Sequence, residues 1–284
     1  MPTLVRSAAR ASRAACHATT LVLALVCVVW PMSVAAQDTP RTLVALLAHP
    51  DDETPAGPIL ARYAREGVKV FVIIASEGGQ GTAARGGPRP DSAGASALAR
   101  TRSEEARCSA KALGAEAPVI LGFPDGKLGD YIADGALLFR LTARVAEELA
   151  RLRPDAVITW GPEGGMGHPD HRLVSTVATQ LARAGAPGMP ERLYYMYMPA
   201  EAFRAMYPQR GAPAYLVPDV KYVTVRVPFT PADLDAAQRA MSCHRSQFTP
   251  EAMARVLPQQ ARFWNGAIPL APAFSTATGA DVFR

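Results

Sequence analysis

Short apolar runs that alternate with helical patterns are the feature that most restricts how this chain can fold. Apolar strands are predicted at 42–48, 68–75, 118–121, 156–160, 193–198 and 222–227. Helices are predicted between and after them, at 58–66, 97–113, 135–151, 169–184, 231–244 and 250–263. Brief apolar strands separated by helices are typical of a mainly parallel sheet with helices on both faces. The sequence therefore predicts an α/β fold, a three-layer sandwich of the Rossmann-like type.

The residues after the first predicted strand argue against a nucleotide-binding protein, which is the obvious alternative for such a sandwich. Nucleotide-binding sandwiches carry Gly-x-Gly-x-x-Gly at this point, where the backbone approaches a pyrophosphate. This chain instead has His49-Pro50-Asp51-Asp52-Glu53. An acidic turn repels a pyrophosphate, so dinucleotide binding is not supported.

A second cluster, His168-Pro169-Asp170-His171, follows the predicted strand 156–160. Because the carboxyl ends of parallel strands meet at one edge of a sheet, both clusters are expected in one crevice. Either cluster alone is compatible with a solvated charged turn. Together, their imidazoles and carboxylates resist burial unless a cation neutralises them, and nitrogen and oxygen ligands suit a divalent ion such as zinc.

The adjacent carboxylates Asp51 and Asp52 are expected to have separate tasks. Successive side chains of an extended backbone diverge, so one carboxylate can hold the ion while the other takes a proton from an attacking water. A protonated His168, supported by Asp170, can donate to the oxyanion that develops. The chemistry indicated is hydrolysis of an amide or an ester.

These motifs resemble the PIG-L/LmbE-like family, which includes the GlcNAc-phosphatidylinositol de-N-acetylase and the deacetylases of mycothiol and bacillithiol synthesis. The resemblance spans roughly residues 42–247. It rests on the two His/Asp clusters and on the segments 102–105 (Arg-Ser-Glu-Glu), 122–126 (Gly-Phe-Pro-Asp-Gly) and 244–247 (His-Arg-Ser-Gln).

The resemblance implies a metal-dependent N-deacetylase that acts on an N-acetylglucosamine-type sugar or conjugate. It implies zinc, with Fe²⁺ as an alternative. The implied metal ligands are His49, Asp52 and His171, the implied general base is Asp51, and the implied helpers are His168, which polarises the substrate carbonyl, and Asp170, which orients His168.

Several alternatives stay open at this point. The chain can be a hydrolase of another amide or ester, or a carbohydrate-binding homologue without turnover. Glu53 is equally compatible with a place behind the metal ligands and with a charge at a helix N-terminus, and a structural role is favoured for His244. Arg85 and Arg89, in a Gly-rich loop predicted over 77–96, can line a solvated face or grip a sugar.

Residues 1–36 are predicted to be a signal peptide. Arg6, Arg10 and Arg13 precede an apolar stretch that is short for a membrane span, and small residues end the segment at Ala36. The sequence thus predicts export to the periplasm or the extracellular space, with no stable membrane span after cleavage; an uncleaved membrane anchor is the competing interpretation of this segment. The deacetylase domain is predicted over 37–265, and residues 266–284 are predicted to be an extended tail.

The charge of the remaining chain gives no support for a nucleic-acid partner. The signal segment contributes three Arg and no acidic residue to the formal net charge of +5, which leaves +2. Cys108 and Cys243 remain after cleavage, and two small buried unpaired side chains are favoured over a disulfide, although export permits one. The sequence leaves the oligomeric state open.

Overall fold

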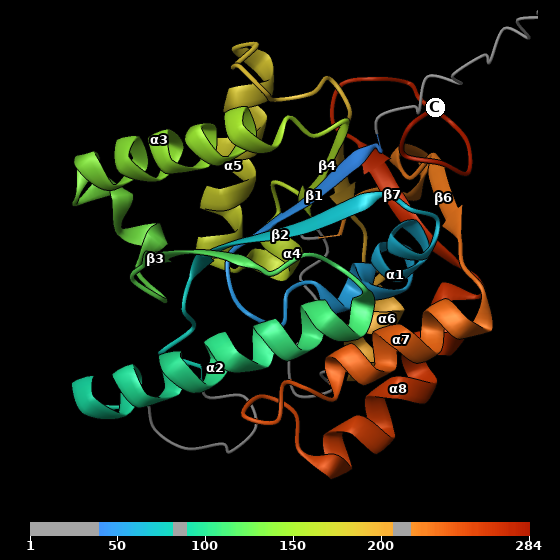
Figure 1. Cartoon of the computed structure of the whole chain (residues 1–284), viewed down its shortest axis with the longest axis horizontal. Helices are drawn as coiled ribbons and strands as arrows, with labels where there is room; N and C mark the ends of the chain where they lie inside the picture. The colour runs from blue at the N-terminus through green and yellow to red at the C-terminus, as the bar shows by residue number, and fades with distance from the viewer. Residues whose placement is uncertain (1–39, 82–89, 207–216) are drawn as a thin grey trace, which may run out of the picture. The chain divides into compact units, whose positions relative to one another are not determined.

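A seven-stranded sheet, ordered β3-β2-β1-β4-β5-β7-β6, forms the centre of the protein (Figure 1). The computed structural model describes residues 40–81, 90–206 and 217–284. The strands are β1 (Thr42–Leu47), β2 (Lys69–Ser76), β3 (Val119–Phe123), β4 (Ala156–Trp160), β5 (Leu193–Met196), β6 (Val225–Pro228) and β7 (Ala267–Pro272). Strands β1 to β5 pair in parallel, and β7 is antiparallel to both β5 and β6.

Helices connect and cover these strands. The α-helices are α1 (Gly57–Arg65), α2 (Ser92–Leu113), α3 (Gly135–Leu152), α4 (Gly164–Gly167), α5 (Pro169–Arg183), α6 (Ala200–Met206), α7 (Pro231–Met241) and α8 (Pro250–Trp264). Within the described residues, the short 3-10 helices are η1 (Thr54–Ala56), η2 (Leu128–Ile132) and η3 (Val220–Tyr222). In the described part of the chain, no helix combines the length and apolar character needed to cross a bilayer.

Alternate residues of β1 face two separate apolar cores, which makes the sandwich three-layered. Leu43 and Leu47 belong to the core formed with α1, α2 and α7. Val44 and Leu46 belong to the core formed with α3 and α5, which lie on the opposite face of the sheet (Figure 1). A strand that is buried on both faces must be apolar throughout, as β1 is. The predicted α/β sandwich with a mainly parallel sheet is confirmed.

The order of the strands places a crevice between β1 and β4. The chain proceeds from β1 to β2 and β3 on one side, then crosses to β4 on the other side of β1. Ligands of open α/β sheets bind outside the carboxyl ends of the strands at such a switch in direction. The segments that leave β1 and β4 are the two His/Asp clusters. The fold therefore brings them to the expected place.

Local sequence explains where α2 and α5 begin. The Asp91 side chain accepts a hydrogen bond from the Gly94 N–H, so α2 begins at Ser92, earlier than the predicted residue 97. His168 caps α5, and Pro169 occupies the first turn, where a missing N–H costs nothing. The predicted signal peptide, residues 1–36, and the loop residues Arg85 and Arg89 lie outside the described residues.

The C-terminal segment is part of the sheet, which corrects the predicted extended tail over 266–284. Strand β7 pairs with β5 on one side and β6 on the other. Near the end of the chain, Val282 is fully buried and Phe283 is 7% exposed. The Phe283 and Tyr63 rings pack edge to face, with their centroids 5.1 Å apart. The domain thus continues to the last residues.

Cys108 and Cys243 form a disulfide, contrary to the expectation of two unpaired thiols. Their Cα atoms lie 5.8 Å apart, within the usual range for a disulfide. The bond connects α2 to the segment that follows α7. Sequence alone could not bring the two residues together, because 135 positions separate them.

Candidate metal centre and active site

Three side chains converge at the carboxyl ends of β1 and β4. His49 Nδ1 lies 3.1 Å from His171 Nε2, and His171 Nε2 lies 3.1 Å from Asp52 Oδ1. His49 Nδ1 lies 3.5 Å from Asp52 Oδ2. All three residues are at least nine-tenths buried. The structure thus brings together the three residues that were predicted as metal ligands.

In each imidazole, one ring nitrogen points into the triad (the inner nitrogen) and the other points away from it (the outer nitrogen). Each outer nitrogen already has an oxygen partner. His49 Nε2 lies 3.2 Å from both Asp170 Oδ2 and Asp125 Oδ1. His171 Nδ1 lies 3.0 Å from the carbonyl oxygen of Gly164, to which it donates. These contacts place the protons of neutral rings on the outer nitrogens and leave the inner nitrogens with lone pairs. Metal-bound histidines in proteins have this arrangement.

The spacing of the inner atoms fits a tetrahedral zinc ion. Ligand atoms bound at about 2.0–2.1 Å in a tetrahedron lie about 3.3–3.4 Å from one another. His171 Nε2 lies 3.1 Å from both His49 Nδ1 and Asp52 Oδ1, slightly below that value, and the other Asp52 oxygen, Oδ2, lies 3.5 Å from His49 Nδ1. Asp52 Oδ2 also accepts the backbone N–H groups of Ala48 and His49, which fixes the carboxylate in place. Two imidazoles and one carboxylate are a common ligand set of catalytic zinc sites, which keep a further position open.

The electrostatics of the triad favour a positive charge at its centre. Burial opposes a charge on His49, but its contacts with the carboxylates of Asp125, Asp170 and Asp52 outweigh burial and raise the pKa of His49 well above its usual value. Burial likewise disfavours ionised Asp52, but His171 and His49 hold its pKa well below the usual range. Either a proton or a metal ion would supply the positive charge that these pKa shifts favour.

A second group of potential ligands, His49, Asp125 and Asp170, lies on the other side of the His49 ring. Asp170 is 1% exposed, and its carboxylate accepts the backbone N–H groups of Gly126, Leu128 and Gly129. Since these bonds occupy its lone pairs, Asp170 is better suited to orient His49 than to bind an ion. The Nδ1 side of His49 is therefore the better candidate position for a metal ion.

The backbone of Asp51 is held in a conformation that L-residues rarely adopt. Its φ angle is +94°, and a non-glycine residue in such a region costs on the order of 1–3 kcal/mol. Glu53 Oε2 accepts the Asp51 N–H at 3.0 Å, and Arg102 Nη2 lies 3.2 Å from Asp51 Oδ2. Burial raises the pKa of Asp51 to about 6, although Arg102 acts in the opposite direction. The turn, not an extended backbone, makes Asp51 and Asp52 diverge.

His168 lies beside the triad; the residue reaches solvent, but much of its ring is covered by neighbouring groups. Its ring stacks on the His171 ring at 4.5 Å. Burial of the ring and the neighbouring His171 and His49 lower the pKa of His168 to about 4, so the ring is neutral at physiological pH, not protonated as expected. Its Nδ1 accepts the backbone N–H of Asp170, which places the remaining proton on Nε2. The expected contact between the Asp170 carboxylate and His168 is replaced by the contact with His49.

Glu53 connects the turn to two distant segments. Its Oε1 accepts Ser109 Oγ from α2 at 2.5 Å and contacts His244 Nε2 at 2.6 Å. Glu53 is 3% exposed and His244 is fully buried. Burial raises the pKa of Glu53, but His244 and Ser109 outweigh that effect and lower it. Glu53 therefore supports the site from behind. This is one of the two positions that the sequence left open for it.

Sequence reasoning did not assign Asp125, Arg102 or Ser109 to the site. Asp125 stands in the segment 122–126, and Arg102 begins the segment 102–105. Both segments contributed to the family resemblance, but the sequence assigned no role to the individual side chains in them. Ser109 lies between unremarkable helical residues, and only the packing of α2 brings it to Glu53.

Two glycines shape the turn that presents His171. Gly164 and Gly165 have φ angles of +73° and +52°. A Cβ atom on Gly165 would lie 2.5 Å from the Trp160 ring, which itself stacks on His171 at 4.9 Å. Glycine is thus required here for both the backbone conformation and the close approach.

Comparisons with known proteins place this chain among deacetylase sequences. Residues 44–182 match the family model described as PIG-L: GlcNAc-PI de-N-acetylase. The 1D-myo-inositol 2-acetamido-2-deoxy-alpha-D-glucopyranoside deacetylase of Rhodococcus jostii (strain RHA1) is 33% identical over 242 residues. That match covers 74% of this chain and 82% of the relative.

Solved structures show the same fold. The N,N'-diacetylchitobiose deacetylase from Pyrococcus horikoshii has a TM-score of 0.58 at 19% identity, and 82% of each chain is covered. The conserved protein TT1542 from Thermus thermophilus has a TM-score of 0.56 at 25% identity, with 84% of this chain and 97% of that chain covered. The match to the Rhodococcus enzyme over most of its length, together with the family model over residues 44–182, shows that the chain belongs to the PIG-L family.

Proposed function

We propose that this chain is an exported, zinc-dependent hydrolase that removes the acetyl group from an N-acetylglucosamine-type sugar or conjugate. The observation that carries the proposal is the convergence of His49 Nδ1, His171 Nε2 and the Asp52 carboxylate, with separations of 3.1–3.5 Å. The outer ring nitrogens of both histidines face oxygen acceptors, which supports metal binding on the inner side.

The residues around the triad have the properties that amide hydrolysis needs. Zinc bound there would polarise a carbonyl oxygen and acidify a water molecule at neutral pH. Arg102 holds one carboxylate oxygen of Asp51, and the other takes the proton of the attacking water. His168 donates from Nε2 to the carbonyl oxygen as negative charge develops on it. Asp51 then returns its proton to the amine nitrogen as the carbon–nitrogen bond breaks.

The substrate class is proposed from the names of the relatives. One is a deacetylase of a 2-acetamido-2-deoxy-glucopyranoside, and another is a deacetylase of N,N'-diacetylchitobiose. Both names combine an acetylated amino sugar with loss of an acetyl group. Zinc-loaded and Fe²⁺-loaded protein should release a primary amine and acetate from N-acetylglucosamine conjugates, measured by amine labelling and by an acetate assay.

The same screen decides between this proposal and its alternatives. Turnover of another acyl amide or ester, without acetate release from any acetamido sugar, would identify a different metal-dependent hydrolase. Saturable sugar binding without any turnover by the metal-loaded protein would identify a carbohydrate-binding homologue. An Asp51→Asn variant is the control, since amine release must depend on the proposed base.

Export is proposed from the first 36 residues, in which three arginines precede an apolar stretch and small residues. An exported enzyme meets envelope or scavenged sugars instead of cytosolic conjugates. Mass spectrometry of protein recovered from the periplasm or medium should find Gln37 as the first residue. Recovery of the full-length chain from the cytoplasm would contradict export.

A further inference from the structure

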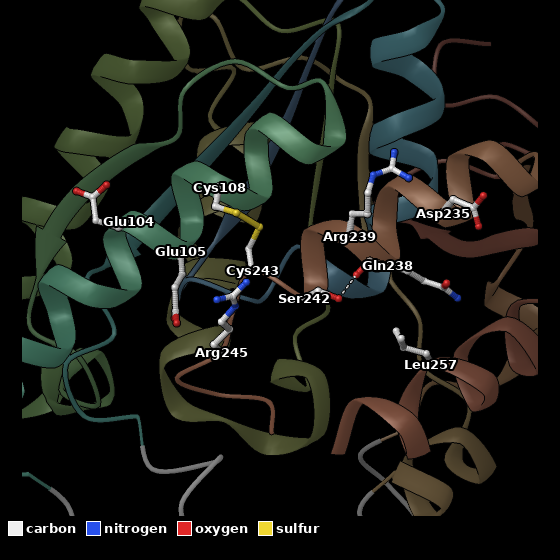
Figure 2. Close-up of a pocket in the computed structure, with 10 residues that line it drawn as sticks. All are labelled: Glu104, Glu105, Cys108, Asp235, Gln238, Arg239, Ser242, Cys243, Arg245 and Leu257. Atoms are coloured by element: carbon white, nitrogen blue, oxygen red, sulfur yellow. Dashed lines mark hydrogen bonds between the residues drawn. A yellow bond between two sulfur atoms is a disulfide. The ribbon is translucent and has the colours of Figure 1, made fainter. Parts of the chain in front are cut away.

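We infer that the Cys108–Cys243 disulfide positions the proposed base, Asp51, through Ser109, His244 and Glu53. This inference rests on the function proposed above and extends it to the part of the fold that holds the base. Figure 2 shows the disulfide between α2 and the segment after α7.

The residue that follows each cysteine contacts the same carboxylate oxygen. Ser109 follows Cys108, and its Oγ donates to Glu53 Oε1 at 2.5 Å. His244 follows Cys243, and its Nε2 lies 2.6 Å from the same oxygen. The disulfide therefore fixes the spacing of the two groups that hold Glu53 from opposite segments.

Glu53 passes this constraint to Asp51. Its second oxygen, Oε2, accepts the Asp51 backbone N–H at 3.0 Å. Asp51 has a φ angle of +94°, a conformation that persists only where surrounding contacts impose it. Glu53 and His244 are buried, so water cannot easily replace a lost partner. A shift of either donor is thus expected to move the backbone that carries the base.

A second pair of contacts also attaches the 243–247 segment to α2. Glu105 accepts the Ser246 N–H at 2.7 Å and the Ser246 Oγ at 2.6 Å. If these bonds alone keep His244 in place, the disulfide adds stability and nothing else. The experiment must therefore separate positioning of Asp51 from global stability.

The disulfide can be reached from solvent in the folded protein. Cys108 is exposed and Cys243 is half-buried. Both line a groove whose other residues include Glu104, Arg239 and Arg245 (Figure 2). The groups it fixes, Ser109 and His244, are buried. A reductant can therefore break the bond without first unfolding the site.

The test compares the zinc-loaded wild-type chain with the Cys108→Ala/Cys243→Ala variant below the melting temperature of both. A small misplacement of a catalytic group is costly, so kcat should fall on the order of 10-fold. The KM and the zinc content should not change. Hydrogen–deuterium exchange of the Asp51 amide should accelerate, while the amides of β1 should stay protected.

Three controls assign the effect to the proposed route. Asp233→Asn destabilises α7 without touching Glu53, and it should leave kcat and Asp51 exchange unchanged. His244→Gln keeps a nitrogen donor and should retain more kcat than His244→Ala. Dithiothreitol reduces the wild-type disulfide to two thiols and is oxidised to its own cyclic disulfide; it should slow the wild type and not the double variant.

Unchanged kcat and unchanged Asp51 exchange in the double variant, at wild-type zinc content, would overturn the inference and leave the disulfide a purely stabilising role. A double variant that does not fold shifts the decision to the folded wild type before and after reduction by dithiothreitol, where reduction should accelerate exchange of the Asp51 amide and unchanged exchange would overturn the inference. The exchange measurement needs no substrate. It therefore decides the inference even if the chain fails to deacetylate any sugar.

Discussion

His49 Nδ1 and His171 Nε2 face each other at 3.1 Å, although the outer nitrogens of both rings already contact oxygen acceptors. Two inward lone pairs at this distance repel each other unless a cation lies between them. The nearby carboxylate of Asp52 increases the attraction for such a cation. The pair is therefore built for occupation by a positive charge.

The first prediction concerns the histidines of this pair. His171→Ala removes one of the three proposed ligands and should lower zinc affinity more than about 100-fold. This exceeds the roughly 10–100-fold loss that is typical when a group that supports a ligand from behind is removed. Competition with a chromogenic chelator measures this affinity. His168→Ala is the matched control: it should keep zinc and mainly lower kcat. Equal zinc loss in both variants contradicts the ligand assignment.

The second prediction separates Asp51 from Asp52. Asn tolerates the left-handed backbone of residue 51 better than most residues, so Asp51→Asn removes the base with little change in the turn. It should keep zinc and lose about 10²–10⁴-fold in kcat. Asp52→Asn should lose zinc instead. Metal content by mass spectrometry and single-substrate kinetics distinguish the two variants. Equal zinc loss in both would contradict the proposed separation of base and ligand.

The third prediction is for Asp170, whose carboxylate bonds the backbone at Gly126 and Leu128 and contacts His49 Nε2. Asp170→Asn replaces one acceptor oxygen by a donor and disturbs the orientation of His49. Zinc affinity should fall about 10–100-fold. If Asp170 instead serves only His168, the variant will bind zinc normally and lose only kcat.

The convergence of the two His/Asp clusters could be predicted because local sequence determines where each cluster lies. His49 and Asp52 follow an apolar strand directly, and His171 lies in the first turn of a helix that His168 caps. Parallel strands then bring the two clusters to one edge. Strand order was enough to predict that the clusters meet, whereas the choice of His49, Asp52 and His171 as ligands came from the family resemblance.

The remaining parts depend on long-range packing. Glu53 meets Ser109 and His244 only because α2 and α7 pack side by side, and the disulfide joins residues 135 positions apart. Strand β7 was hidden by Pro269 and Pro272, since proline argues against a strand inside a sheet. Here a short antiparallel strand accommodates both prolines, paired to β5 and β6.

The fourth prediction tests the role of the C-terminal residues. Phe283 is 7% exposed and packs on Tyr63, whose hydroxyl donates to Asp281 and accepts the Val282 N–H. Phe283→Ala should lower the free energy of unfolding by about 3–5 kcal/mol. The matched control is Phe139→Ala, since Phe139 is 75% exposed and should change stability by less than about 0.5 kcal/mol. Urea denaturation measures both, and equal effects would mean that the end of the chain is not part of the core.

The fifth prediction concerns acid stability and the buried Asp233. Burial opposes its ionisation, but a two-point contact with Arg65 and hydrogen bonds from Thr230 lower the pKa of Asp233 to about 2. An unfolded Asp titrates near pH 3.9, so ionised Asp233 stabilises the fold above about pH 4. That stabilisation disappears as pH falls through about 2. Because half of the Arg65 side chain is exposed, we expect about 1–2 kcal/mol, less than the full shift implies.

Asp233→Asn should therefore be less stable than the wild type at pH 7, and the difference between them should shrink between pH 4 and pH 2. Urea denaturation at several pH values measures it, with Glu104→Gln as the control, since the Glu104 side chain is 75% exposed. The control difference should stay near zero throughout. A difference between Asp233→Asn and the wild type that does not change with pH would show that the capping hydrogen bonds, which Asn can partly keep, outweigh the charge. The contact between Arg65 and Asp233 would then stabilise the fold through packing and hydrogen bonds and not through the charge of Asp233.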